Sequence, residues 1–327
     1  MTIRFILAAH LGLTMFLTAT LGRPTIIAHR GASGYLPEHT LEAASYAHAL
    51  GVDFIEQDVV MSQDDVLVVC HDVHIDTTTD VATRHPARRR ADGRYYAVDF
   101  TWEELKALQV RERFDPATGR PVYPRRFPHN QSSFRLCTME EQIRLIQGLN
   151  QSTGRTVGLY PEIKVPAWHA REGKDPGRAL LALLAKHGYT RRTDPVVVQC
   201  FDATELQRLR QAGSSKLTFV LLLEPRGSRG YPPEEHLSPE GLRRVASYAQ
   251  GIGPHLSLLV QHEQAGAPRF LPLARHAHEA GLMIHAYTFR ADQLPAGVSR
   301  LEDLLREVVD GTDLDGYFSD QPDIRPR

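Results

Sequence analysis

Early in the chain, two histidines, an arginine and a pair of carboxylates lie in or directly after apolar runs. They are His29 and Arg30 after the first run, Glu56 and Asp58 within the second, and His71 after the third. Histidine can move a proton near neutral pH, and a guanidinium offers a planar fork for two phosphate oxygens. Alternate residues of a strand point the same way, so Glu56 and Asp58 can bind one cation together. These residue types predict a metal-assisted phosphodiester cleavage site.

His29 and His71 are the candidates for the two proton transfers that such a cleavage requires. One would remove a proton from the attacking oxygen, and the other would supply a proton to the leaving alkoxide. The chain has 16 histidines, so most of them must be bystanders. These two differ because each ends an expected strand and precedes an ionic residue, Arg30 or Asp72. We therefore predict that both are catalytic.

The alternating carboxylates are expected to be buried, because apolar residues flank them at 54–55 and 59–60. An ion-paired surface strand is the alternative reading of the Glu-x-Asp spacing. Buried carboxylates need partners, and a cation satisfies several at once. Carboxylate oxygens suit hard cations and disfavour zinc. We expect one divalent cation, with Ca²⁺ as the first choice and Mg²⁺ as the alternative.

Three motifs in this order carry a family resemblance. They are Ile-Ala-His-Arg-Gly-Ala-Ser-Gly-Tyr-Leu-Pro-Glu-His-Thr at 27–40, Glu-Gln-Asp at 56–58 and Tyr-Pro-Glu-Ile-Lys at 160–164. The chain resembles the glycerophosphodiester phosphodiesterases over nearly its whole length after residue 24. The wider family often has Asn at the position of His39, whereas the periplasmic bacterial branch is similar to this sequence there. The resemblance is therefore to that branch.

The resemblance implies roles for further residues. Glu162 would join the two early carboxylates as a metal ligand, and Lys164, on the same strand face, would join Arg30 on the phosphate. The implied metal ligands are Glu56, Asp58 and Glu162, and the implied substrate-binding residues are Arg30, Lys164, Gln199, Phe201 and Tyr287. Core packing is an equal alternative for the two aromatic residues. Glu38 and His39 are expected to brace the loop that carries His29 rather than to react.

The implied activity is hydrolysis of glycerophosphodiesters, such as glycerophosphocholine, to sn-glycerol 3-phosphate and an alcohol. The resemblance further implies two steps through a cyclic phosphate. A phospholipase acting on lipid is one alternative, for which an apolar rim around the site is expected. A binding protein that has lost catalysis is another, but every residue of the implied machinery is present in this chain.

Short β-branched runs alternate with amphipathic runs, which predicts successive βα units and a (β/α)8 TIM barrel. The family resemblance implies the same fold. Strands are expected at 25–28, 53–60, 66–70, 157–163, 196–201, 217–223, 257–260, 282–287 and 316–319. Helix starts are expected at capping boxes that begin with Thr101, Thr138 and Ser299. Helix ends are expected at Gly51, Gly188, Gly213, Gly251, Gly281 and Gly311.

Residues 73–135 break this rhythm, because they form a long polar stretch rich in Arg, Pro and Gly. We interpret them as an insertion after an early barrel strand. The insertion follows His71, so it would rise from the catalytic end of the barrel as a lid or as one wall of the pocket. A solvated surface excursion is the alternative for most of its arginines.

The first 22 residues have the form of a secretory signal peptide, with a short basic start and an apolar run from residue 5 to residue 21. An uncleaved anchor is the alternative. We thus expect a signal peptide at 1–22, a barrel domain at 23–327 and a periplasmic location.

Composition limits the partners. The net charge of −1 arises from 38 basic and 39 acidic residues, so no global field would recruit nucleic acid or hold the protein on a membrane. The expected partner is the small-molecule substrate, and a homodimer is left open. The three cysteines, Cys70, Cys137 and Cys200, cannot all pair within one chain, and we expect buried thiols without catalytic use.

Overall fold

The computed structural model describes residues 23–213, 216–225, 234–262 and 267–326. The expected signal peptide at 1–22 lies outside the described residues. Within the described part of the chain, no helix is both long enough and apolar enough to cross a membrane.

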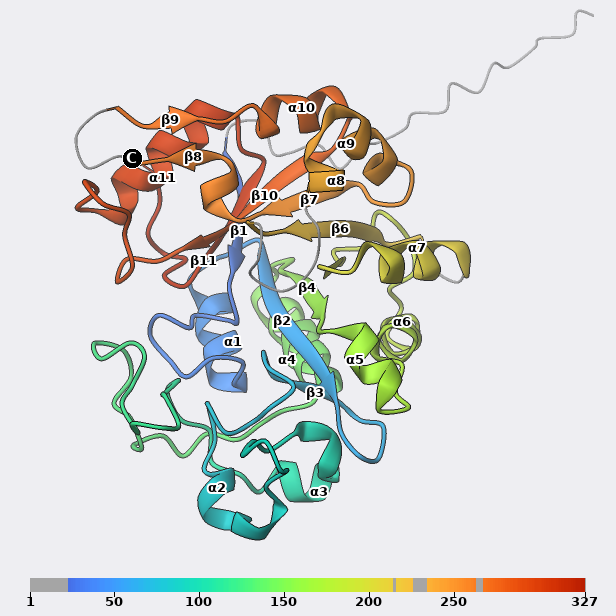
Figure 1. Cartoon of the computed structure of the whole chain (residues 1–327), viewed down its shortest axis with the longest axis vertical. Helices are drawn as coiled ribbons and strands as arrows, with labels where there is room; N and C mark the ends of the chain where they lie inside the picture. Colours follow the sequence, from blue (N-terminus) through green and yellow to red (C-terminus); the bar gives the residue numbers. More distant parts are fainter. Residues whose placement is uncertain (1–22, 214–215, 226–233, 263–266, 327) are drawn as a thin grey trace, which may run out of the picture.

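The described residues form a closed barrel of eight parallel strands, as predicted. The strands are β1 (Thr25–Ala28), β2 (Phe54–Met61), β4 (Gly158–Ile163), β5 (Val197–Cys200), β6 (Thr218–Leu223), β7 (Gly251–Pro254), β10 (Met283–Phe289) and β11 (Gly316–Ser319). Around the barrel their order is β1, β11, β10, β7, β6, β5, β4 and β2, and the ring closes because β1 also pairs with β2. The strands converge at the centre of Figure 1, with the helices outside them.

Helices follow the barrel strands, and the longer ones pack against the outer faces of the strands. They are α1 (Leu41–Ala49), α4 (Met139–Thr153), α5 (Pro166–Arg171), α6 (Pro176–Lys186), α7 (Ala203–Gln211), α8 (Glu234–Leu237), α9 (Pro239–Ala246), α10 (Leu273–Glu279) and α11 (Leu301–Thr312). A main hydrophobic core lies between helices and strands, and a smaller cluster that includes Ile27, Tyr160 and Phe318 fills the barrel interior. Burial of these apolar side chains is what holds the strand ends in place.

The strand register sets the height of the predicted site residues. On β2 and β4, Glu56 pairs with Tyr160 and Asp58 pairs with Glu162. On β4 and β5, Glu162 pairs with Gln199. Because paired residues of neighbouring strands share one level, this register brings Asp58, Glu162 and Gln199 together.

The expected helix starts are partly confirmed. Thr138 caps α4 and Thr101 caps α3 (Trp102–Leu105), and both make complete capping boxes. The start predicted at Ser299 is wrong, because α11 begins at Leu301 and its N-cap, Arg300, makes no side-chain capping bond. A serine and a glutamate at the right spacing thus do not cap a helix unless the backbone enters it at the serine.

One predicted strand and two predicted helix ends are wrong. The barrel strand is β7 at 251–254. Residues 257–260 instead hold the end of η3 (Leu256–Leu258) and the start of β8 (Val260–Gln261), which pairs with β9 (Arg269–Phe270). Gly251 therefore begins a strand, and Gly311 lies inside α11. Close packing explains the glycines in β7, since a Cβ on Gly253 would lie 2.5 Å from Leu222 Cδ2.

The run predicted at 66–70 forms a strand outside the barrel. This strand, β3 (Leu67–Val69), folds back antiparallel onto β2, with Val59 opposite Val69. The reversal returns the chain to the level of Asp58, whose carbonyl accepts a hydrogen bond from the Cys70 N–H. His71 is thus delivered by a hairpin and not by a barrel strand.

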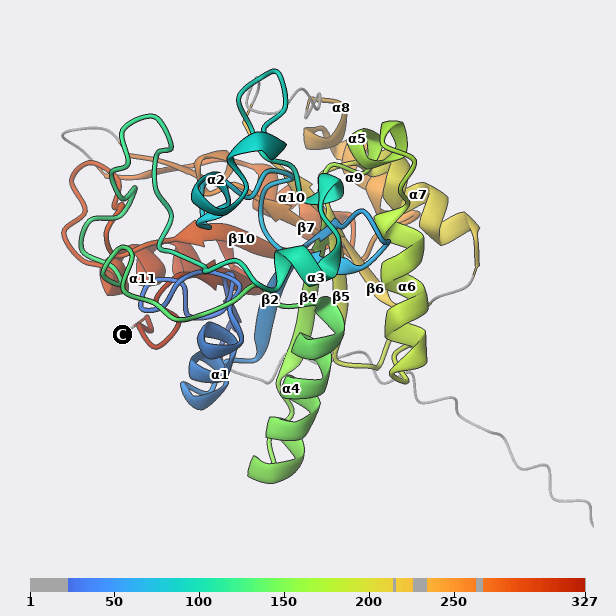
Figure 2. The same cartoon turned by 90° about the horizontal axis from the view of Figure 1, so that it is seen from below.

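The insertion between β3 and α4 has its own hydrophobic core. It contains α2 (Val81–Arg84), η1 (Pro86–Arg88), η2 (Ala97–Asp99) and α3. Side chains such as Ile75, Phe100 and Leu105 are fully buried there. Figure 2 shows the insertion at the end of the barrel where α4 begins. The polar composition of this segment therefore conceals a packed unit.

All three cysteines are buried free thiols, as predicted. Burial raises the pKa of Cys70 and of Cys137 to about 12. A thiol that stays protonated is a poor nucleophile, so the cysteines have no catalytic part.

Candidate active site

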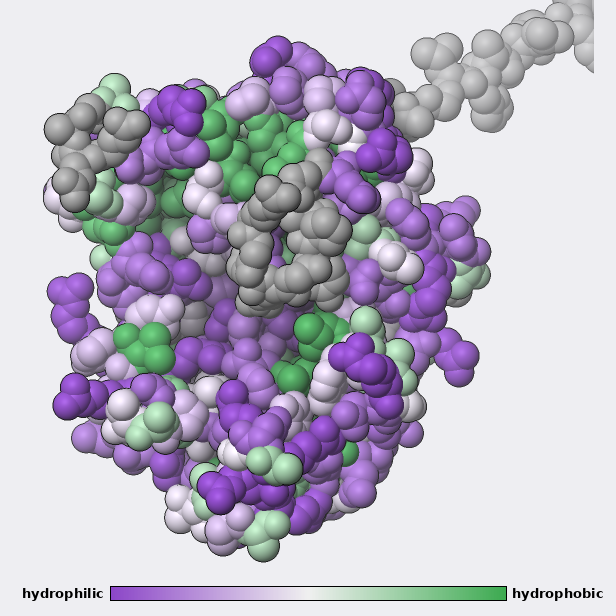
Figure 3. Space-filling view, viewed as in Figure 1, coloured by the Kyte–Doolittle hydropathy of each residue, from purple (hydrophilic) through white to green (hydrophobic). Residues whose placement is uncertain are grey.

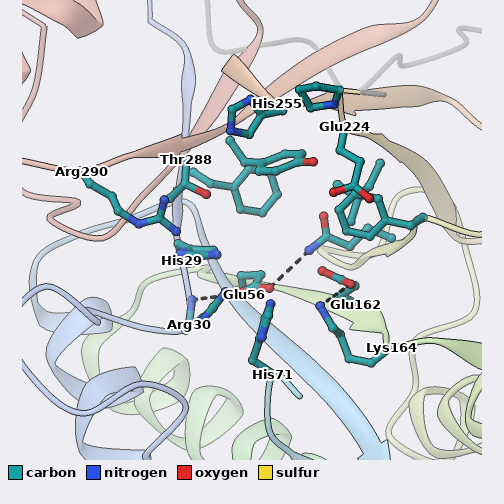
Figure 4. Close-up of a pocket in the computed structure, with 16 residues that line it drawn as sticks. His29, Arg30, Glu56, His71, Glu162, Lys164, Glu224, His255, Thr288 and Arg290 are labelled. Carbon is teal, nitrogen blue, oxygen red and sulfur yellow. Dashed lines mark hydrogen bonds and ion pairs between the residues drawn. The ribbon is translucent and has the colours of Figure 1, made fainter. Parts of the chain in front are cut away.

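A cavity of about 340 Å³ lies at the carboxyl ends of the barrel strands. Sequence-predicted residues that line it are His29, Arg30, Glu56, His71, Glu162, Lys164, Gln199, Phe201 and Tyr287. Other lining residues are Leu222, Glu224, Pro225, His255, Thr288, Arg290 and Phe318. Figure 4 shows His29 and His71 on either side of Glu56, with Glu224 and His255 at the far end. Strand ends of a (β/α)8 barrel are where its catalytic residues are found.

The three predicted metal ligands lie together and are almost fully buried. Asp58 is 1% exposed and lies next to the cavity, and its Oδ1 is 3.3 Å from Lys164 Nζ. Lys164 Nζ also lies 2.6 Å from Glu162 Oε1. On the other side, Glu56 Oε2 accepts a 2.6 Å hydrogen bond from the backbone N–H of Arg30. The arrangement concentrates negative charge where only a few cationic groups balance it.

His39 belongs to this cluster, which the sequence did not indicate. Its Nε2 lies 2.7 Å from Asp58 Oδ2, and ligand atoms of His39, Glu56 and Asp58 all lie within 4.8 Å of one another. The bracing role expected for His39 is consistent with its contact to Asp58. The same contact makes its imidazole a candidate ligand in addition to the carboxylates.

The protonation of the carboxylates indicates that the cluster suits a cation. Burial and the neighbouring charge of Asp58 raise the pKa of Glu56 well above its ordinary value. Burial also acts against charge on Asp58, but Lys164 and His71 hold its pKa well below the ordinary value. Glu56 therefore favours its protonated form, and a bound cation would stabilise the charged carboxylate instead. Asp58 Oδ1 accepts no hydrogen bond from the described residues, so the Lys164 ammonium at 3.3 Å is the group with which a metal would compete for this oxygen.

His29 forms a buried pair with Asp320, the residue directly after β11. The two side-chain atoms, His29 Nδ1 and Asp320 Oδ1, are 2.6 Å apart. Because a carboxylate only accepts, the ring N–H lies on Nδ1 and the other nitrogen, Nε2, has its lone pair available. Burial, together with the charge of Arg30, lowers the pKa of His29 to about 4 despite Asp320. His29 is therefore neutral at pH 7 and can act as a base.

His71 forms an equivalent pair with Asp72, with Nδ1 2.8 Å from Oδ1. Burial, with the positive charges of Arg30 and Lys164, lowers the pKa of His71 well below its ordinary value. An anionic phosphate between these cations would offset their effect and raise the pKa again. The pair can then hold a proton for a leaving group once substrate is bound.

The predicted phosphate-binding cations face the same cavity. Arg30 has a φ of 57°, and this left-handed conformation lets its backbone N–H reach Glu56. Its guanidinium lies 3.1 Å from Glu38 Oε1 and 3.6 Å from Asp58 Oδ2. Lys164 enters from the end of β4. The two cations therefore hold fixed positions around the cavity without any substrate.

The remaining predicted residues form the cavity wall. Gln199 Nε2 donates to Glu56 Oε1 at 3.5 Å. The rings of Phe201 and Tyr287 meet edge to face, with their centroids 6.0 Å apart, and the Tyr287 hydroxyl donates to the Leu223 carbonyl. Both aromatic residues line the cavity, and their part in substrate binding stays a prediction.

Sequence reasoning missed several residues around the site. Asp320 and Arg290 could have been found from the strand pattern. Asp320 directly follows the strand expected at 316–319, and Arg290 directly follows β10, which extends beyond the strand expected at 282–287. Arg113 and Arg126 carried no such signal, since they stand in the insertion among many arginines. Arg113 contacts Asp72 and Arg126 contacts Asp320, and these contacts depend on tertiary packing alone.

Comparison with known proteins agrees with this geometry. Residues 29–324 match the Glycerophosphoryl diester phosphodiesterase family. The chain belongs to this family. It is 40% identical over 319 residues to a glycerophosphodiester phosphodiesterase of Haemophilus influenzae, covering 91% of this chain and 87% of that protein. A glycerophosphodiester phosphodiesterase of Treponema pallidum is 38% identical, with 91% and 90% covered.

Solved structures share the fold. A glycerophosphoryl diester phosphodiesterase of Silicibacter pomeroyi superposes with a TM-score of 0.69 at 24% identity, covering 91% of this chain and 90% of that one. An Oleispira antarctica phosphodiesterase, solved in complex with the product sn-glycerol-3-phosphate, superposes with a TM-score of 0.62 at 21% identity. The match covers 92% of this chain and 94% of the Oleispira chain.

Proposed function

We propose that this protein hydrolyses glycerophosphodiesters to sn-glycerol 3-phosphate and an alcohol with the help of one divalent cation. The observation that carries the proposal is a single cavity that combines buried carboxylates, phosphate-binding cations and two His–Asp pairs. Family membership supports the same reaction. The product named for the Oleispira relative is also the product proposed here.

The chain's residues suit a two-step displacement. Arg30 and Lys164 would hold the phosphate oxygens. One of His29 and His71 would take the proton of the glycerol 2-hydroxyl, whose oxygen then bonds to phosphorus. The other histidine would give a proton to the alkoxide as its bond to phosphorus breaks. Water would open the resulting cyclic phosphate with the histidine roles reversed.

Glu56, Asp58 and Glu162, with His39 nearby, would hold the cation. When bound, a divalent cation polarises a phosphoryl oxygen and lowers the pKa of a coordinated hydroxyl. The family is metal-dependent, which supports this part of the proposal. We propose Ca²⁺, because it accepts several carboxylate oxygens in flexible geometry, with Mg²⁺ as the alternative.

A small soluble phosphodiester is the substrate class we favour over a membrane lipid. Figure 3 shows a mainly hydrophilic surface over the part of the molecule where the insertion lies in Figure 1. A lipid-binding rim is expected to be apolar instead. Retained activity on intact phospholipid, with none on its deacylated form, would contradict this choice.

Location and assembly remain proposals from the sequence. The basic start and apolar run of residues 1–22 support export to the periplasm. Recovery of the mature protein in a periplasmic fraction, shortened by about this length, would support it. Light scattering of the purified protein would decide between a monomer and a homodimer.

The proposed reaction is tested by measuring release of sn-glycerol 3-phosphate from glycerophosphocholine. Protein lacking residues 1–22 is assayed with Ca²⁺, with Mg²⁺ and with a chelator. Release that depends on one of these cations is the expected result and identifies the better cofactor. No release by folded protein under any of the three conditions would refute the proposal.

A further inference from the structure

Two arginines of the insertion lie directly behind the two catalytic histidines. Arg126 contacts the carboxylate that pairs with His29, and Arg113 contacts the carboxylate that pairs with His71. Among the described residues, the contacts of Arg126 and those of Arg113 have no residue in common. One polar segment outside the barrel therefore reaches both proton-transfer groups of the site.

The first network is buried. Asp320 uses Oδ1 for His29 and Oδ2 for Arg126, whose Nη2 lies 2.6 Å away, and Arg290 Nε donates to the same Oδ2 at 2.8 Å. Arg126 is itself held by Asp292 through two hydrogen bonds of 2.7 and 3.0 Å. Its side chain is 5% exposed. The guanidinium is thus a fixed part of the protein interior.

Arg126 also reaches the loop that carries His29. Its Nη1 donates to the carbonyl of Ser33 at 3.2 Å. The Ser33 hydroxyl in turn donates to the carbonyl of His29 at 2.8 Å. The arginine therefore restrains the histidine through its backbone as well as through its carboxylate partner.

The second network repeats the arrangement. Asp72 uses Oδ1 for His71 and Oδ2 for Arg113, whose Nη1 lies 2.8 Å away. The Arg113 guanidinium donates hydrogen bonds to both carboxylate oxygens of Glu38, at 2.6 and 2.9 Å. Glu38 also accepts from the Arg30 guanidinium at 3.1 Å. Arg113 therefore positions a catalytic histidine and a phosphate-binding arginine together.

Each aspartate binds a histidine with one carboxylate oxygen and an arginine with the other, and this arrangement restrains the imidazole. A carboxylate that holds only a histidine can rotate about its own axis, and the imidazole turns with it. A guanidinium on the second oxygen removes this freedom, because its planar donors match the carboxylate geometry. Positive charge also stabilises the buried carboxylate of Asp320, since Arg290 first and Arg126 with it hold its pKa well below the ordinary value.

We propose that the insertion serves as a catalytic brace, with Arg113 and Arg126 as positioning residues for His71 and His29. The inference rests on the proposed function for its kinetic consequences. It differs from the lid expected from the sequence, because these arginines act from behind the histidines and their contacts need no closing motion. Undocking the insertion would then disable both proton transfers at once.

The test compares Arg113→Gln and Arg126→Gln with a matched control, Arg90→Gln. Arg90 is also an arginine of the insertion and bridges it to the barrel through Asp99 and Glu172, outside the cavity. We expect kcat to fall about 10- to 100-fold in each of the first two variants. KM should change less than kcat in Arg126→Gln, and more in Arg113→Gln, because Arg113 also holds Arg30 through Glu38. The control should keep kcat within about twofold. Arg113→Lys and Arg126→Lys should recover part of the loss.

A second readout does not depend on activity. In proton NMR, each His–Asp pair should give a downfield Nδ1–H signal, assigned by its loss in His29→Gln or His71→Gln. Arg126→Gln should broaden or remove the His29 signal alone, Arg113→Gln the His71 signal alone, and Arg90→Gln neither.

Three outcomes would overturn the inference. The first is wild-type kcat in the folded Gln variants, and the second is an equal loss in Arg90→Gln. The third is unchanged His signals in both Gln variants. If either Gln variant fails to fold, the same comparisons apply to its Lys variant. If wild-type protein releases no product, the proposed function fails, and the NMR comparison still decides the inference.

Discussion

Replacing Asp320 by Asn should separate the orientation of His29 from the stability of the fold. The Asp320 side chain is 2% exposed and accepts from His29, Arg126 and Arg290. An amide keeps the size of the carboxylate but adds N–H donors. If the NH₂ group faces His29, it donates to Nδ1 and moves the ring proton to Nε2. His29, the proposed base in one of the two steps, would then have no lone pair toward the substrate.

The expected loss in kcat is about 10³-fold, equivalent to about 4 kcal/mol of transition-state stabilisation. The expected loss in stability is about 3 kcal/mol, the lower end for breaking a buried ion pair. We choose the lower end because Arg126 keeps its two bonds to Asp292. For a domain of this size the change corresponds to a fall in Tm of about 5 °C.

The assay is kcat at saturating glycerophosphocholine, with thermal unfolding measured on the same samples. Asp292→Asn is the matched control, because it removes a carboxylate partner of Arg126 without touching His29. This control should lose stability but keep kcat within about threefold. A kcat within threefold of wild type in Asp320→Asn would refute the orientation argument, whatever the Tm.

Three further predictions concern the catalytic groups and the outer shell of the barrel. His29→Ala and His71→Ala should each lower kcat on glycerophosphocholine at least about 100-fold. The 4-nitrophenyl ester of glycerol phosphate has a leaving group that needs no proton, so on this substrate the variant without the general acid should lose much less activity than the variant without the base. Equal losses in both variants on both substrates would contradict separate roles. Saturating Ca²⁺, at about 100 times its Kd, should stabilise the wild type by about 2.7 kcal/mol in thermal unfolding. Glu56→Gln should abolish this gain, and a Ca²⁺ shift that survives it would place the cation elsewhere. The hydrogen bond to Asp315 raises the pKa of His278 above its ordinary value, so this pair contributes stability in full below about pH 6.5 and loses it as pH rises through the folded pKa. His278→Gln should therefore lower the Tm at pH 6 but not at pH 9, and a constant difference across this range would count against the linkage.

Most of the cavity was predictable from the sequence because barrel geometry converts strand ends into neighbours. His29, Glu162 and Lys164 each stand in or directly after a β-branched run, and parallel strands bring such positions to one end. The roles of these residues remain predictions until variants are measured. Their placement at one end of the barrel follows from the strand pattern, whereas the choice of Glu162 as a metal ligand rests on the family resemblance.

The rest depended on packing that no local pattern encodes. The Gly-Ile-Gly-Pro strand, β7, has a single β-branched residue, Ile252, and its glycines are explained only by the atoms packed against them. The antiparallel turn of β3 could not be distinguished from a barrel strand by composition. The positions of Arg113 and Arg126 follow from the core of the insertion, whose polar surroundings hid its apolar residues.

The pairing of His29 with Asp320 has a consequence for how activity develops as the chain folds. The two residues are 291 positions apart, yet they follow adjacent strands, β1 and β11. The contact between the first and last strands of the barrel therefore runs through the proposed catalytic pair. A partly synthesised chain, or one clipped before β11, can contain every other residue of the site and still lack an oriented base. Activity therefore requires a closed barrel. An incomplete chain is expected to stay inactive toward phosphodiesters until β11 has paired with β1.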